Sequence, residues 1–279
     1  MINMKEIEIE NELRRVVRRL FLEKRIDIFI GFEDSLNGVR PCFIKSVDEV
    51  DRLVWNKFCK NNLALYLLRF DCRVGIVAKG CDEGAIIELI KENQISRENL
   101  YIIGIPCNGI YSEDNKIYSV CKTCTRRNPL IADIIIGELV DEKDMTFDDL
   151  KEIEDMPIKD RFRFWIREFE NCILCYACRN ICPLCYCNEC YLDRRDLIDL
   201  RERNLSDKIF FHLSRAIHLA GRCIECGECE RACPMNIKLG KLFRKISKEV
   251  WELFEYKPGI GIEDKNPLIT FDPKRDEEL

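Results

Sequence analysis

Two copies of one cysteine pattern, C-x2-C-x2-C-x3-C-P, constrain what this chain can fold into. The stretch CILCYACRNICP holds the first copy and CIECGECERACP the second. The eight cysteines are Cys172, Cys175, Cys178 and Cys182 in the first copy, and Cys223, Cys226, Cys229 and Cys233 in the second. In each copy three thiols follow at short intervals and a fourth precedes a proline. Each copy must therefore wrap a short loop around whatever its thiols bind.

This spacing resembles that of bacterial two-cluster ferredoxins, in which three thiolates hold one 4Fe–4S cluster and the fourth crosses to the other. We therefore predict cluster 1 on Cys172, Cys175, Cys178 and Cys233, and cluster 2 on Cys223, Cys226, Cys229 and Cys182. Zinc modules use other spacings, so zinc is the weaker interpretation of this repeat. The expected fold here is an α+β dicluster ferredoxin-like domain.

The compartment decides how the 18 cysteines of this 279-residue chain are interpreted. The start, MINMKEIEIENELRR, lacks the apolar core of a signal peptide, and no apolar run approaches the roughly 18 residues that span a bilayer. We expect a cytoplasmic protein without membrane insertion, whose cysteines bind metal rather than form disulfides. The net charge of −5, with no basic stripe, predicts no nucleic-acid partner.

The first half of the sequence alternates strand-like and helix-like stretches. The apolar runs IDIFIG, VGIVAKG, LYIIGIP and ADIIIG, at residues 26–31, 74–80, 100–106 and 132–137, predict buried strands. A capping box of Ser46 and Glu49 predicts a helix over residues 46–58, and Asp82 is the expected N-cap of another over 81–93. Alternating strands and helices predict an α/β domain with a mostly parallel sheet.

We predict three parts along the chain. Residues 1–157 form the α/β domain with its acidic linker, residues 158–238 the dicluster domain, and residues 239–279 a C-terminal helix and tail. The sequence LGKLFRKISKEVWELFEY, from residue 239, has apolar residues at helical spacing. This helix is expected to pack on the metal domain or on a partner.

Forty residues, 183–222, separate the two motif copies, more than a minimal dicluster ferredoxin needs. The insert contains a predicted helix over 205–221, with Ser206 as its cap. Its inward side chains are expected to be Ile209, Phe210, Leu213 and Ile217. His212 and His218 lie six residues apart on this helix and face different ways, so we predict helix-surface or packing roles and no catalytic residue.

The insert also holds the triplet Cys185, Cys187 and Cys190 in CYCNEC. Three thiols are one ligand short of a tetrahedral site, and Cys42, Cys59 or a partner's residue would complete it. The triplet then binds a further cluster or zinc. In the other interpretation its members are buried thiols packed beside the clusters.

A second group of cysteines lies in the first half: Cys81, Cys107, Cys121 and Cys124. Cys81 and Cys107 follow predicted strands, and CKTC precedes ADIIIG. Because ligands gather at the carboxyl edge of parallel strands, four thiolates here would hold a third 4Fe–4S cluster. Zinc and scattered core cysteines are the other interpretations, and Cys72, which stands alone, is predicted to be structural.

Three stretches, VGIVAKGCDEGAI, YIIGIPCNG and CKTCTRRNPLIADIIIG, make residues 13–137 resemble the beta subunits of coenzyme F420 hydrogenases, dehydrogenases and related formate dehydrogenases. The resemblance implies that Cys81, Cys107, Cys121 and Cys124 hold a cluster next to an FAD, with a dicluster module alongside. The glutamine- and glycine-rich loop that the family has near its flavin is not found, and no G-x-G-x-x-G motif occurs. FAD binding is therefore an alternative here.

The cysteines and the resemblance together predict an iron–sulfur electron-transfer subunit of a larger anaerobic oxidoreductase complex, of hydrogenase, formate dehydrogenase or heterodisulfide-reductase type. Its partners are then the other subunits of that complex. A flavin-containing subunit that reacts with coenzyme F420 or a nicotinamide and feeds the clusters is the second hypothesis. A zinc-stabilised scaffold is the third.

Overall fold

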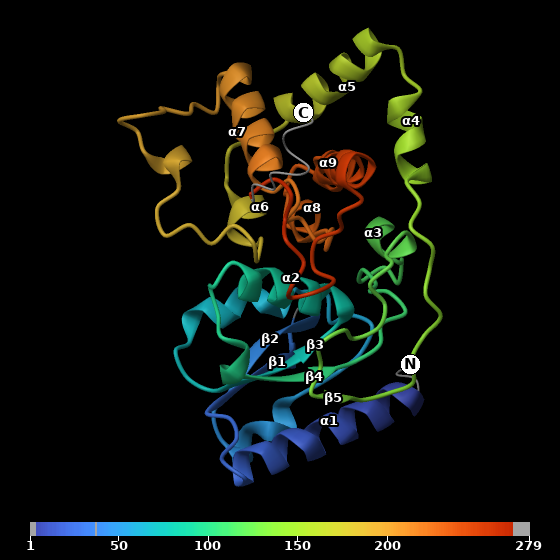
Figure 1. Ribbon diagram of the computed structural model, residues 1–279, viewed down its shortest axis with the longest axis vertical. Helices are drawn as coiled ribbons and strands as arrows, with labels where there is room; N and C mark the ends of the chain where they lie inside the picture. The colour runs from blue at the N-terminus through green and yellow to red at the C-terminus, as the bar shows by residue number, and fades with distance from the viewer. Residues whose placement is uncertain (1–3, 37, 270–279) are drawn as a thin grey trace. The chain divides into compact units, whose positions relative to one another are not determined.

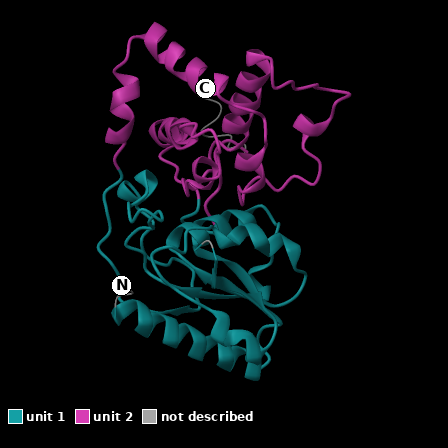
Figure 2. Cartoon of the chain, turned by 180° about the vertical axis from the view of Figure 1, so that it is seen from behind, with its two compact units in different colours: residues 1–145, 259–262 teal, residues 146–258, 263–279 magenta. Residues whose placement is uncertain are grey.

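The computed structural model describes residues 4–36 and 38–269, and the chain divides into two compact units (Figures 1 and 2). Unit 1 comprises residues 1–145 with 259–262, and unit 2 comprises residues 146–258 with 263–279. The short segment 259–262 returns to unit 1, where the Gly259 amide donates to the buried Glu88 carboxylate at 2.7 Å.

Unit 1 is built on a five-stranded sheet with the order β2-β1-β3-β4-β5. The strands are β1 (Ile28–Ser35), β2 (Gly38–Ile44), β3 (Val74–Ala78), β4 (Leu100–Gly104) and β5 (Ile134–Ile135). β1, β3, β4 and β5 pair in parallel, and β2 pairs antiparallel with β1. The four strands predicted from the sequence are present, and the predicted mostly parallel α/β architecture is confirmed.

Helices cover the sheet of unit 1. α1 (Met4–Leu22) and α2 (Gly80–Lys91) lie on opposite sides of it (Figure 1). Every residue of β3 is buried, which is why its sequence is a continuous apolar run without polar alternation. The short helices η2 (Leu63–Arg69), η3 (Arg97–Asn99) and α3 (Ser119–Lys122) occupy the connections.

The helix predicted over residues 46–58 is wrong in extent. Only a short 3-10 helix, η1 (Val47–Arg52), forms there, and the Ser46 side chain makes no capping hydrogen bond. The chain leaves the helical path because the Val54 amide donates to the Phe32 carbonyl at 2.8 Å. The apolar residues after Arg52 thus pack along the sheet instead of on a helix.

The start of α2 also differs from the prediction. Lys79 is the N-cap residue, and Asp82 stands three residues later, where its carboxylate accepts from the Lys79 amide. Asp82 is therefore the N3 residue of a capping box, and not the N-cap residue. It is a buried side chain, which the sequence pattern alone did not indicate.

In its described part, unit 2 consists of helices joined by loops. In chain order they are η4 (Asp148–Leu150), α4 (Lys151–Glu154), α5 (Ile158–Glu170), α6 (Ala177–Asn180), η5 (Tyr191–Asp193), α7 (Leu205–His218), α8 (Glu228–Arg231) and α9 (Leu239–Phe254). η4 and α4 fall in the stretch expected to be a linker. α9 is the predicted C-terminal helix, and Leu242, Phe243 and Val250 are buried on it.

α7 is present as predicted, but the face assigned to the interior is wrong. Asn204 is its N-cap residue in place of Ser206. Phe210, Leu213 and Ile217 are 43%, 44% and 68% exposed. The buried side chains are Phe211, His212, Arg215 and Ala216. The prediction placed the more apolar face of α7 inward. In the structure the inward face instead carries two polar side chains, those of His212 and Arg215.

Candidate iron–sulfur sites

The two cysteine motifs of unit 2 adopt the same backbone conformation. Leu174 and Glu225, at matching positions of the two copies, have φ angles of 45° and 57°. Tyr176 and Gly227, two residues further on, have φ angles of 59° and 73°. Left-handed residues at these positions turn the chain sharply between successive cysteines. A short helix follows each turn, α6 in the first copy and α8 in the second.

Thiols from both copies line one small cavity in unit 2. The cavity is lined by Cys172, Cys175 and Cys178 of the first motif and by Cys233 of the second. These are the four residues predicted for cluster 1. The remaining wall is apolar and aromatic, and it includes Phe211 of α7 and Pro234. A hydrophobic environment around the sulfurs is one of the means by which proteins set the reduction potential of a cluster.

The other four thiols lie near one another as well. Burial, with the charges of Cys223 and Cys226, raises the pKa of Cys229 well above 9.0. A hydrogen bond with Cys185 and burial raise the pKa of Cys182, which also feels the charge of Cys226. Cys182 of the first motif thus neighbours the second set.

The donors around these thiols suit thiolate ligands. The Leu174 amide donates to the Cys172 sulfur at 3.3 Å. Arg215 of α7 donates from Nη1 to the Cys178 sulfur at 3.2 Å. Burial raises the pKa of Cys178 to about 11, although Arg215 acts in the opposite direction. Thiols crowded into an apolar interior resist ionisation by themselves, whereas iron binds the deprotonated form. The residues therefore fit a 4Fe–4S cluster.

The triplet of the insert is not gathered in one place. Cys185 lies beside Cys182, and its sulfur is 3.8 Å from Nη2 of Arg215. Cys187 is exposed. Cys190 instead neighbours Arg179: burial lowers the pKa of this guanidinium, but Asp193 and, to a smaller extent, Cys190 outweigh burial and raise it. A site on these three thiols, or one completed by the buried Cys42 or Cys59, stays a prediction.

The amino-terminal cysteines follow the carboxyl ends of neighbouring strands in unit 1. Cys81 stands in the first turn of α2 after β3, Cys107 follows β4, and Cys121 is part of α3. Burial raises the pKa of Cys107 to about 11, and Cys121 and Cys124 add to the effect. Cys124 and Cys107 likewise act on Cys81. The fold thus brings all four predicted thiols into electrostatic range of one another.

Backbone amides also point at sulfurs of this set. The Gly109 amide donates to the Cys107 sulfur at 3.3 Å, and the Ile110 amide donates to the Cys121 sulfur at 3.5 Å. Gly80, which precedes Cys81, is needed for close approach: a Cβ there would lie 2.5 Å from the Arg126 carbonyl oxygen. The loop that carries Cys124 can therefore lie against the start of α2. This set also fits a cluster.

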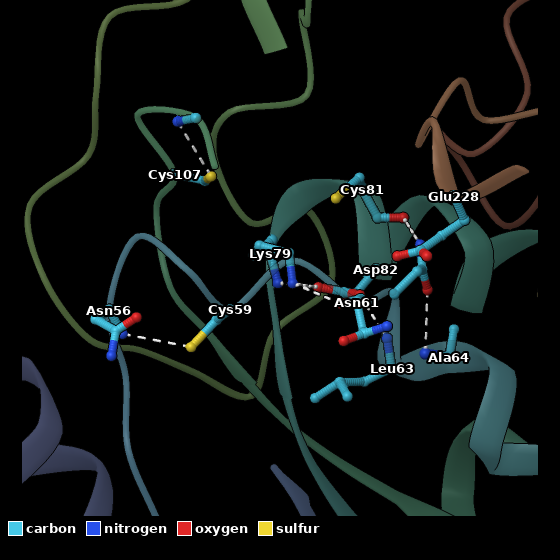
Figure 3. A network of polar contacts seen from close by, with 12 residues as sticks. Asn56, Cys59, Asn61, Leu63, Ala64, Lys79, Cys81, Asp82, Cys107 and Glu228 are labelled. Atoms are coloured by element: carbon cyan, nitrogen blue, oxygen red, sulfur yellow. Dashed lines mark hydrogen bonds and ion pairs between the residues drawn. The ribbon is translucent and has the colours of Figure 1, made fainter. Parts of the chain in front are cut away.

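Sequence reasoning missed Lys79, the residue at the start of this site. Its side chain is 2% exposed, and its ammonium lies 2.9 Å from the Asp82 carboxylate (Figure 3). Lys79 Nζ also donates to the Asn61 carbonyl at 3.0 Å and lies over the Phe32 ring at 5.0 Å. A lysine in an apolar run is a signal for such a buried cation, but its partner is not visible until the fold is known.

A cavity of about 630 Å³ lies within unit 1 beside this set. Cys107 and Lys79 line it, together with the aromatic side chains of Trp55 and Tyr111. Its volume falls within the roughly 300–1,000 Å³ of small-molecule sites. The cavity therefore offers room for an organic ligand in contact with a predicted cluster ligand.

The remaining sequence candidates, His212, His218 and Cys72, contact aromatic or charged neighbours. His212 is buried and stacks on Phe169 with ring centroids 4.9 Å apart, and His218 lies against Tyr191 at 5.2 Å. Cys72 is half-buried and lies near Asp27. Over residues 4–36 and 38–269, no three histidine, cysteine or carboxylate side chains are placed to hold a single metal ion. In the same residues no helix is long and apolar enough to cross a membrane.

Comparison with known proteins covers both units. A 4Fe-4S dicluster domain matches residues 168–237. The F420-dependent formate dehydrogenase subunit beta of Methanocaldococcus jannaschii is 25% identical, over 82% of this chain and 85% of that protein. The F420-dependent formate dehydrogenase 1 subunit beta of Methanococcus maripaludis is 25% identical, over 88% and 86%.

The chain is thus similar, over most of its length, to the beta subunits of two F420-dependent formate dehydrogenases. The resemblance seen in the three cysteine-containing stretches is thereby confirmed, as is the dicluster domain that follows the α/β domain. Because the similarity covers both cysteine-containing units, their cysteines are the candidate functional residues.

Proposed function

We propose that this chain is an iron–sulfur electron-transfer subunit of a larger oxidoreductase complex of the formate dehydrogenase type. The observation that carries the proposal is the cavity shared by Cys172, Cys175 and Cys178 of one motif and Cys233 of the other. Only a chain that interleaves its two motifs brings these four thiols together, as two-cluster ferredoxins do. The names of the two relatives support the type of complex.

The residues have distinct roles in this proposal. 4Fe–4S clusters accept and donate single electrons. The twelve cysteines hold them: Cys172, Cys175, Cys178 and Cys233; Cys182, Cys223, Cys226 and Cys229; and Cys81, Cys107, Cys121 and Cys124. The amides of Leu174, Gly109 and Ile110 donate to thiolate sulfurs. Phe211 and Pro234 form part of the hydrophobic wall around cluster 1.

Iron and acid-labile sulfide in anaerobically purified protein test this function. Two clusters correspond to about eight atoms of each element and three clusters to about twelve. We expect a brown protein that gains a paramagnetic signal on reduction with dithionite. A colourless protein with a few zinc atoms and no sulfide would overturn the proposal and favour the zinc-stabilised scaffold.

A second candidate function is a flavin-containing subunit that exchanges electrons with coenzyme F420 or a nicotinamide. The cavity beside Cys107 favours it, because a flavin there would lie next to a predicted cluster ligand. Flavins convert two-electron hydride transfer into single-electron steps. In that case Lys79, which lines the cavity, would be among the residues that contact the flavin.

Flavin released by acid from the purified protein separates the two candidates. Val140→Trp, which places an indole in the lining of the cavity, is expected to lower the flavin content while the iron content is unchanged. Val39→Trp on β2, away from the lining, is the matched control. Protein that is rich in iron but free of flavin leaves only the electron-transfer function.

A further inference from the structure

Arg215 is a buried cation on the inner face of α7. Arg215 is only 3% exposed to solvent. Nη1 donates to the Cys178 sulfur at 3.2 Å, and Nη2 donates to the Cys178 carbonyl at 3.0 Å. Nη2 also lies 3.8 Å from the Cys185 sulfur. The guanidinium is thus directed at a predicted ligand of cluster 1.

The surroundings of Arg215 contain aromatic rings and thiols. The guanidinium carbon lies 5.7 Å from the Phe211 ring centre and 5.3 Å from that of Phe243. In the described part of the chain, no carboxylate forms an ion pair with it. Burial by itself would lower the pKa of Arg215, and the groups that raise it instead are Cys178, Cys185, Cys182 and Cys229.

These thiols belong to both predicted clusters. Cys178 is a predicted ligand of cluster 1, and Cys182 and Cys229 are predicted ligands of cluster 2. A buried charge needs compensating charge or hydrogen bonds nearby, and the thiolates are what this site offers. Arg215 is therefore a counter-ion for Cys178 of cluster 1, and through Cys185, which is hydrogen-bonded to Cys182, it also lies near a ligand of cluster 2.

We propose that Arg215 tunes the reduction potentials of both clusters of the dicluster domain and keeps them higher than they would otherwise be. The inference rests on the proposed iron–sulfur function. Reduction adds one electron, and so one negative charge, to a cluster without breaking a bond. A fixed positive charge and an N–H donor at a ligand sulfur stabilise that reduced state. The effect is larger for cluster 1, because Arg215 contacts its ligand Cys178 directly.

This role also gives the insert a function. The 40 residues between the motif copies carry α7, and α7 places Arg215 against the first motif. Phe211 and His212 are buried on the same face of α7 as Arg215. The helix thus delivers a charge that two short cysteine motifs alone do not contain.

Arg215→Gln tests the proposal in an anaerobic redox titration followed by electron paramagnetic resonance. We expect the equilibrium constant for one-electron reduction of cluster 1 to fall about tenfold, which corresponds to a potential lower by about 59 mV. The potential of cluster 2 falls by less. Arg201→Gln is the control, because Arg201 lies in the same insert but is exposed and paired with Asp199 at 2.8 Å. Both clusters of Arg201→Gln are expected to have the same reduction potentials as those of the unmodified protein.

Two further measurements decide the matter if Arg215→Gln fails to assemble. Arg215→Lys keeps the charge but loses the planar guanidinium that donates to both the Cys178 sulfur and its carbonyl. The potential of cluster 1 is therefore expected to fall below that of the unmodified protein, but by less than about 59 mV, and that of cluster 2 to stay the same. In the unmodified protein labelled with ¹⁵N-arginine, reduced cluster 1 is expected to show a nitrogen coupling in pulsed resonance spectra.

Unchanged potentials in iron-loaded Arg215→Gln, or an absent ¹⁵N coupling, would overturn the role of Arg215. Neither result affects the proposed function, which fails only if the unmodified protein carries no clusters. The two failures are therefore separate observations.

Discussion

The Lys79 ammonium lies 2.9 Å from the Asp82 carboxylate, and both side chains are buried within unit 1. Asp82 also accepts from the Leu63 amide and the Lys79 amide, each at 2.8 Å (Figure 3). The pair therefore joins η2 to the start of α2, where Cys81 stands. A buried pair with its hydrogen bonds satisfied is costly to break on one side only, because the remaining charge has no partner.

Asp82→Ala is expected to lower the free energy of unfolding by about 3–5 kcal/mol. Denaturant unfolding followed by circular dichroism under anaerobic conditions measures the loss. Asp51→Ala is the control, because Asp51 pairs with Arg18 at 2.8 Å but is 74% exposed. Its loss should stay below about 1 kcal/mol. Equal losses in the two variants would contradict the role given to burial.

Asp149 of η4 holds the first part of unit 2 to α9. Its carboxylate lies 2.9 Å from Lys241 Nζ and 2.8 Å from Arg244 Nε. Asp149→Asn removes the charge from a partly buried site, so we expect a loss of about 1–2 kcal/mol in the free energy of unfolding. Asp160→Asn, an exposed carboxylate paired with Arg163, should change stability by less than about 0.5 kcal/mol.

The pH dependence of the Asp149 deficit follows from its ionisation. Burial raises the pKa of Asp149, but hydrogen bonds from Arg244 and Lys241 outweigh burial and hold it below 3.8. A carboxylate with a depressed folded-state pKa contributes its full stability above the unfolded pKa and loses it as the pH falls through the folded value. The deficit of Asp149→Asn should therefore be constant between pH 8 and pH 5. A deficit that shrinks over this range would show that another group carries the effect.

The elements that the sequence predicted are those with a strong local signal. β3 and β4 are continuous apolar runs, and the spacing of the cysteine repeat fixes a loop conformation that the left-handed Leu174 and Glu225 share. β2 was missed because GVRPCFI is buried at only two of its seven positions and contains a proline. A strand at the sheet edge tolerates both features, so its sequence carries little pattern.

The rest depended on partners that are distant in sequence. Residues 53–58 leave the helical path because Val54 bonds to Phe32, some twenty residues earlier. The inner face of α7 is the one that carries Arg215, because its partner Cys178 lies 37 residues away. Propensity and periodicity describe a segment by itself, and here the tertiary contact outweighed them. Lys79 and Asp82 are only three residues apart, but their burial depends on contacts with Leu63 and Phe32, which are distant in sequence.

Cys107→Ser is expected to remove one cluster from unit 1 and to lower the iron content by about a third in a protein with three clusters. The thiol is a predicted ligand, and a backbone amide already donates to its sulfur. Cys72→Ser is the matched control, because Cys72 lies in the same unit and is predicted to be structural. Iron analysis with resonance spectroscopy compares the two. Equal iron in Cys107→Ser and the unmodified protein would exclude the amino-terminal cluster.

Substitutions of single cysteines in unit 2 test how the two motifs exchange ligands. Cys233 lines the same cavity as Cys172, although 61 positions separate them in the sequence, whereas Cys229 neighbours Cys223 and Cys226. Cys233→Ser and Cys172→Ser should therefore alter the same resonance signal, and Cys229→Ser should alter the other. In each variant the untouched cluster keeps its potential within the error of the titration. If Cys233→Ser instead changes the signal that Cys229→Ser changes, each motif holds its own cluster. The interleaved arrangement would then be wrong. In that arrangement Cys233 of the second motif is a ligand of cluster 1, so its substitution must change the signal of cluster 1.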